Sequence, residues 1–134
     1  MDQLIQLIYV SSAVKVFTQQ QLSDLLETAR AANHHHHITG LLLYKDGNFM
    51  QVIEGEEQAI DQLMSNLQND QRHNGIIQIL KEPVQQRNFA DWSMGFKNIS
   101  NEETEGFSDF LEPESRDKLL PGKAKMLLMG FKGR

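Results

Sequence analysis

A tight turn between two apolar segments constrains the fold of this chain more than any other feature. Lys45-Asp46-Gly47-Asn48 contains the Asp-Gly dipeptide, which is the strongest short signal for a β-hairpin turn. The apolar runs on either side therefore predict two adjacent antiparallel strands, over about residues 38–45 and 48–54.

The segment before this hairpin predicts another strand and a helix. Residues 3–10 (QLIQLIYV) form a β-prone run that is broken at Ser11, and because both of its faces are largely apolar we expect an internal strand. Thr18 and Gln21 have the spacing of a capping box, which predicts a helix over about residues 19–32. The inward side of this helix carries apolar residues at helical spacing, namely Leu22, Leu25, Leu26 and Ala29.

The segment after the hairpin predicts a second helix and two more strands. The helix begins near Glu56, and its inward stripe is Ile60, Leu63, Met64 and Leu67. A polar break over residues 69–75 leads into a fourth strand over 76–84, which Pro83 restricts to an edge or an end. Residues 86–99 predict a loop and a short fifth strand.

The resulting order, βαββαββ, indicates an α+β sandwich with the helices on one sheet face. Residues 1–100 form this domain, and residues 101–134 predict a C-terminal helical extension. The extension carries too many apolar residues for a free tail, among them Phe107, Phe110, Leu119 and Leu127. We therefore expect it to dock on the sheet face away from the helices, or on a partner subunit.

Charge and composition exclude several classes of protein. The net charge is −5, whereas a nucleic-acid-binding module needs a basic stripe to neutralise phosphates, so this class is excluded. The absence of cysteine excludes disulfides, thiolate metal sites and cysteine nucleophiles. No signal peptide or membrane-length apolar run is present, so we expect a cytoplasmic protein with no nucleic-acid or membrane partner.

Two polar residues stand on otherwise apolar strand faces. Tyr9 shares its face with Ile5 and Leu7, and Gln51 shares its face with two further apolar residues. A buried amide without partners costs roughly 1–3 kcal/mol, so Gln51 must form hydrogen bonds. Either the two residues bond to each other or to backbone, or both face a polar heteroaromatic ligand between the two helices.

The other polar candidates have simpler structural explanations. Asn33 fits a helix C-cap, and the acids Glu54, Glu56 and Glu57 fit the start of the second helix. Trp92 alternates with Met94 along the last strand, which is typical of core packing. The run His34-His35-His36-His37 could chelate a metal, but a solvated loop is the simpler interpretation.

Five motifs follow one another along the chain: LIYVSSA, Asn33 with ITGLLLY, the F-x-Q-V-I-E-G run, Asp70-x-Arg72-His73 and RNFADWSM. Together they cover about residues 3–99, and in this order they resemble the BLUF family, blue-light sensors that use flavin. The resemblance implies a ferredoxin-like sandwich: a five-stranded mixed sheet with two helices on one face and the C-terminal helices packed elsewhere. It also implies a flavin between the two helices, with FAD expected and FMN or riboflavin as alternatives.

The resemblance also implies roles for individual residues. Tyr9 is the electron and proton donor on excitation, and Gln51 is the bridging amide between Tyr9 and the flavin edge. Asn33 bonds the pyrimidine side of the ring, while Trp92 and Met94 carry the switch outward. The other residues that the resemblance places near the flavin are Leu25, Ile38, Leu67, Asp70, Arg72 and His73.

The implied function is a photoreceptor, not an enzyme, in which light leaves Gln51 rotated or tautomerised. A protein partner, which the sequence does not name, then reads the change, and we expect a homo-oligomer. Two alternatives remain on the same fold: a colourless ligand-binding regulatory module, and a small acylphosphatase-like hydrolase. The hydrolase would need glycine and arginine in the first loop, and SSAVKV supplies neither.

Three positions depart from the family pattern. Ala32 stands where members often have a polar residue, and Asn66 stands where some have arginine. His37 replaces a frequent glycine, which matters little if that loop is exposed.

Overall fold

The computed structural model describes residues 3–13, 18–45, 47–69, 73–90 and 94–98, together with residue 128. Along the chain the elements are β1 (Leu4–Ala13), α1 (Gln19–His35), β2 (Thr39–Lys45), β3 (Asn48–Glu56), α2 (Glu57–Gln68), β4 (His73–Pro83) and β5 (Gly95–Asn98). The predicted order βαββαββ is confirmed.

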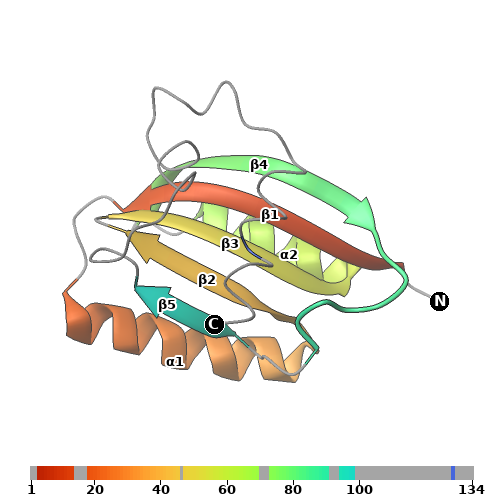
Figure 1. Ribbon diagram of the computed structural model, residues 1–134, viewed down its shortest axis with the longest axis horizontal. Coiled ribbons are helices and arrows are strands. Elements are labelled where there is room, and N and C mark those ends of the chain that lie inside the picture. Colours follow the sequence, from red (N-terminus) through yellow and green to blue (C-terminus); the bar gives the residue numbers. More distant parts are fainter. Residues whose placement is uncertain are drawn as a thin grey trace.

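The strands of the described residues form one five-stranded sheet in the order β4-β1-β3-β2-β5 (Figure 1). All neighbouring strands are antiparallel except β2 and β5, which run parallel, so the sheet is mixed as expected. β1 lies inside the sheet between β4 and β3, and Pro83 ends the edge strand β4. Both positions match the sequence predictions.

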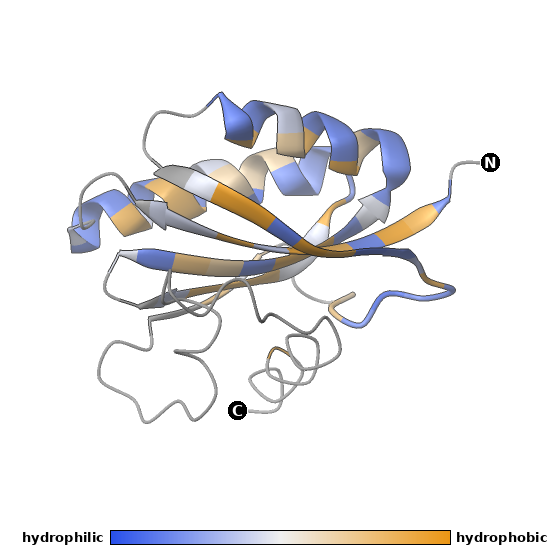
Figure 2. Ribbon diagram, turned by 90° about the horizontal axis from the view of Figure 1, so that it is seen from above, coloured by the Kyte–Doolittle hydropathy of each residue, from blue (hydrophilic) through white to orange (hydrophobic). Residues whose placement is uncertain are grey.

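Both helices cover the same face of the sheet, as Figure 2 shows. On this helix face, Ile5, Leu7 and Ile53 pack with Leu22 of α1 and Ile60 of α2. The opposite face has its own apolar cluster, which consists of Ile8, Val10, Leu41, Leu43, Met50, Val52, Phe89 and Leu128. The alternation of strand side chains therefore gives this sheet two cores rather than one.

Local chemistry explains where the elements begin and turn. Thr18 caps α1 through the predicted capping box with Gln21. Gly47 adopts a φ of 91° in the hairpin, a conformation that glycine tolerates without strain. Gly40 allows β2 to approach β3 closely, because a Cβ there would lie 2.0 Å from the Val52 carbonyl oxygen.

Three predicted boundaries are wrong. β1 continues through Ser11 and Ser12, because Ser12 pairs with Asn48 in the ladder and its hydroxyl bonds the Asn48 side chain at 3.1 Å. α1 extends three residues beyond the predicted end. β4 begins at His73, since pairing with β1 extends it into the segment predicted as a break.

The predicted C-terminal extension lies outside the described residues except for Leu128. That residue is helical and 1% exposed, in the cluster on the face opposite α1 and α2. This position agrees with docking on that face, while the two helices themselves stay a prediction. Among the described residues, no helix has both the length and the apolar character to cross a membrane.

Candidate functional site

Tyr9 and Gln51 lie directly opposite each other on neighbouring strands. The antiparallel register of β1 and β3 pairs their Cα positions, and both side chains project to the face covered by α1 and α2. They are 3% and 7% exposed respectively, in an apolar surrounding that includes Phe49 and Leu42. Strand alternation is sufficient to place this polar pair beneath the helices.

The Gln51 amide is engaged at both of its ends. The Tyr9 hydroxyl donates a hydrogen bond to Gln51 Oε1, and Gln51 Nε2 donates to the Met94 sulfur at 3.1 Å. The prediction that the Tyr9 and Gln51 side chains bond to each other is therefore confirmed. These contacts also give the amide a defined direction, because its acceptor faces a donor and its donor faces an acceptor.

Met94 joins the site from just outside the last strand. It is 2% exposed and lies in a bend one residue before β5, so the prediction that it belongs to that strand is wrong, while its alternation with Trp92 stays a prediction. Its carbonyl oxygen accepts a hydrogen bond from Nε of Arg30 on α1, at 2.9 Å. Sequence reasoning missed Arg30, because a single arginine beside polar helix residues has the pattern of a solvated side chain.

Asn33 is not the C-cap of α1. It lies within the last turn and is 2% exposed, while the C-cap is His36 and the left-handed residue is His37. The Asn33 carbonyl accepts from the backbone N–H of Ile38 at 2.8 Å, which ties the helix end to the start of β2. Its buried carboxamide is thus on the helix-covered side of the sheet, while its bond to a flavin stays a prediction.

The apolar residues named by the resemblance lie in the helix-face core or at its border. Ile38 is buried there, whereas Leu25 of α1 and Leu67 of α2 are half-buried at its border. Three of the other expected site residues lie outside the described residues, as does the side chain of a fourth: Asp70, Arg72, Trp92 and His73 respectively.

Glu54 is a buried carboxylate of the sheet and not a helix-start acid. It is fully buried in β3, on the opposite face from Gln51, while only Glu57 belongs to the first turn of α2. Four donors surround its two oxygens: Gln6 Nε2 at 3.0 Å, the Thr39 hydroxyl at 3.2 Å, and the backbone N–H groups of Asn88 at 2.7 Å and Phe89 at 2.9 Å. Glu54 therefore fixes the chain just before the segment that leads to Met94.

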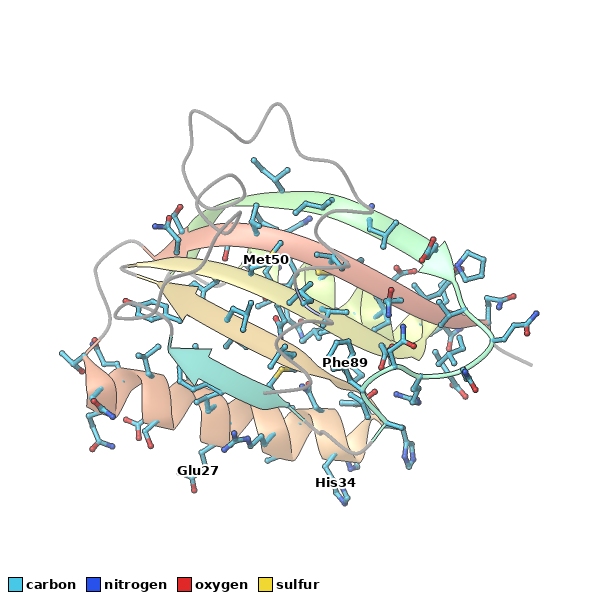
Figure 3. The ribbon with its side chains drawn as sticks, in the orientation of Figure 1. Glu27, His34, Met50 and Phe89 are labelled. Carbon is cyan, nitrogen blue, oxygen red and sulfur yellow. The ribbon has the colours of Figure 1, made fainter. Side chains whose placement is uncertain are left out.

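The four histidines do not form the expected loop. His34 and His35 belong to the last turn of α1, and only His36 and His37 follow it. All four are exposed, and Figure 3 shows His34 pointing away from the sheet. Within the described ranges, no group of three or more acidic or histidine side chains is arranged to hold a metal ion.

Known proteins are similar to this chain in sequence and in fold. The family model "BLUF: Sensors of blue-light using FAD" matches residues 4–95. The photoactivated adenylate cyclase subunit beta of Euglena longa is 34% identical over 92 residues, which are 68% of this chain but 11% of that protein. The chain thus spans about a tenth of the length of that relative.

Two solved structures are similar over nearly the whole chain. The dark-state structure of the BLUF protein BlrB has a TM-score of 0.76 and 28% identity, covering 97% of this chain and 95% of that one. The photo-activated state of BlsA has a TM-score of 0.75 and 28% identity, covering 93% and 91%. Because the family model matches more than half of this chain, the chain belongs to the BLUF family of flavin-binding blue-light sensors.

Proposed function

We propose that Tyr9, Gln51 and Met94 form the light-driven switch of this sensor domain. The observation that carries the proposal is the Gln51 amide, which is held between a phenol donor and a thioether acceptor on the helix-covered face. This is a group that can exchange donor and acceptor by turning over within the same space. Asn33 supplies a second buried carboxamide on that side of the sheet.

The residues present fit a flavin between α1 and α2. A flavin ring needs donors and acceptors along its polar edge, and carboxamides and a phenol provide both. Its flat apolar body needs side chains to enclose it, and the half-buried Leu25 and Leu67 supply apolar surface on the two helices. When bound, the flavin supplies absorption of blue light and the capacity to accept an electron.

The chain's own residues then perform the switch. Tyr9 gives up an electron and its hydroxyl proton, which passes along its hydrogen bond toward Gln51. Their return to Tyr9 leaves the Gln51 amide rotated or tautomerised. In a rotated amide Nε2 faces the Tyr9 oxygen, while Oε1 faces a Met94 sulfur that has no proton to donate.

The Met94 thioether favours one orientation of the Gln51 amide only weakly, and the switch is therefore reversible. Sulfur is a weak acceptor, and a net hydrogen bond contributes about 1 kcal/mol, so the orientation seen in the structure is favoured by only a small margin. The rotated state is consequently metastable and returns thermally. A protein partner, a homo-oligomeric assembly, a cytoplasmic location and the absence of enzymatic activity are further parts of this proposal, carried over from the sequence.

Spectroscopy of the purified protein tests the proposal. We expect a yellow protein whose flavin absorption shifts to the red under blue light and returns in the dark. Tyr9→Phe should still bind flavin, since the ring volume is kept, but should lose the long-lived shift because the donor proton is gone. A folded wild-type protein that stays colourless after refolding with FAD would favour the regulatory-module alternative. A normal reversible shift in Tyr9→Phe would refute the role of Tyr9.

A further inference from the structure

Arg30 is an exposed residue of α1 that is bonded to a buried carbonyl. Its Nε donates to the carbonyl oxygen of Met94 at 2.9 Å, across 64 positions of sequence. Met94 itself is 2% exposed. The contact therefore joins α1 to Met94, whose sulfur accepts the hydrogen bond from Gln51.

Met94 immediately precedes the paired residues of β5. The parallel register of β2 and β5 begins with Leu41 opposite Gly95, one residue after Met94. Met94 lies in a bend at this point. The Arg30 side chain thus holds the backbone at the point where the chain enters β5.

The Met94 side chain depends on such support. Methionine is unbranched, with three rotatable bonds, so packing alone specifies its sulfur position poorly. Yet the Gln51 Nε2 contact requires the sulfur to remain at hydrogen-bonding distance. Fixing the Met94 backbone is the remaining way to limit where the sulfur lies.

We propose that Arg30 is a positioning residue of the switch. By holding the Met94 carbonyl it keeps the sulfur against Gln51 and so favours the amide orientation that the structure shows. Through Met94, the contact also links the Gln51 amide to α1. A rotation of the amide that releases the Met94 sulfur therefore loosens the bond between Arg30 and Met94 that holds this helix. The inference rests on the proposed function, because it names a further residue of the same switch.

A matched pair of variants separates the hydrogen bond from the charge. In Arg30→Gln the amide nitrogen occupies the chain position of Nε and can still donate, whereas Arg30→Met keeps the length and removes the donor. We expect Arg30→Met to slow dark recovery by about three- to tenfold, the range for losing a net hydrogen bond that favours the dark orientation. Arg30→Gln should recover at nearly the wild-type rate.

Controls exclude a general effect on the fold. Glu27→Ala alters an exposed residue one turn away that points from the sheet in Figure 3, and it should recover like wild type. In a Met94→Leu background, which has no sulfur, Arg30→Met should cause no further change. The urea midpoints of all variants are measured alongside, so that a loss of folding is recognised.

The outcomes distinguish this inference from the proposed function. A wild-type protein without a reversible flavin shift would overturn both. A wild type that shifts normally, with Arg30→Met recovering within about twofold of it, would overturn the role of Arg30 alone. Equal slowing in Arg30→Gln and Arg30→Met would also overturn it, because the charge and not the Nε donor would then be responsible.

Discussion

At the scale of single residues, one face of β3 carries Gln51, the proposed switch residue, and the other carries the buried carboxylate of Glu54. Gln51 faces the helices, and Glu54, three positions later, faces the opposite side. The amide has one weak acceptor among its partners, whereas the carboxylate accepts from four donors. A buried carboxylate with four donors is firmly held, whereas an amide with one weak acceptor loses less on reorienting, which agrees with the role proposed for Gln51.

Replacing Gln51 with leucine should separate flavin binding from switching. Leucine fills the apolar surrounding but has no donor and acceptor to exchange, so Gln51→Leu is expected to bind flavin and lose the reversible red shift. The light-minus-dark difference spectrum measures this directly. Gln78→Leu, an exposed amide on β4, serves as the control and should keep the shift. An unchanged shift in Gln51→Leu would assign the switch to another group.

Replacing Glu54 with glutamine should lower stability without changing side-chain size. One carboxylate oxygen becomes an N–H₂ group that faces donors, so at least one buried donor loses its acceptor. We expect the free energy of unfolding to fall by about 2–3 kcal/mol, measured by urea titration. Glu56→Gln is the matched control, because Glu56 is exposed and its side chain does not cap α2, and it should change stability by less than about 0.5 kcal/mol. Equal effects of the two substitutions would contradict the anchoring role.

At the scale of elements, the end of α1 places a residue with a side chain in left-handed backbone. His37 is exposed, as expected, but it adopts a φ of 57° after the C-cap His36. Left-handed backbone disfavours a side chain with a Cβ, and glycine commonly occupies this position after a helix. The departure from the family's glycine therefore has an energetic cost even on the surface.

Restoring glycine at this position should stabilise the protein. His37→Gly removes the Cβ from left-handed backbone, and we expect the free energy of unfolding to rise by about 0.5–1 kcal/mol. His36→Gly is the control, since His36 has a φ of −98° and gains nothing from glycine. Urea or thermal unfolding compares the two. A loss of stability in His37→Gly similar to that in His36→Gly would show that the left-handed residue carries no strain.

At the scale of the whole molecule, the sheet is buried on both sides by different parts of the chain. The two helices cover one face (Figure 2), and the cluster on the other face includes Phe89 and Leu128. Leu128 is 1% exposed although it lies far along the sequence from the sheet. Leu128 therefore contributes to the apolar cluster on the face opposite the helices.

Truncating Leu128 should measure this contribution. Leu128→Ala leaves a cavity in a buried cluster, so we expect the free energy of unfolding to fall by about 2–4 kcal/mol. Ile77→Ala, at a residue of β4 that is 37% exposed, is the comparison and should cost much less. Both are measured by urea unfolding monitored by far-UV circular dichroism. A change in Leu128→Ala no larger than that in Ile77→Ala would show that the opposite face does not depend on this residue.

The fold and the polar pair could be predicted from the sequence because their signals are local. Strand alternation placed Tyr9 and Gln51 on apolar faces, the Asp-Gly turn located the hairpin, and Thr18 with Gln21 located the start of α1. Each of these features depends on backbone geometry within a few residues, and the types of the residues in that segment indicate it.

The contacts that complete the site depend on segments far apart in the chain and left no local pattern. Arg30 reaches Met94 across 64 positions, and Glu54 meets Asn88 and Phe89 across 34 and 35. Asn33 resembled a helix cap and Glu54 a helix-start acid, since in sequence both stand beside a helix end. Whether such a group caps a helix or is buried depends on which strand and loop pack against it, and that was decided only when the sheet assembled.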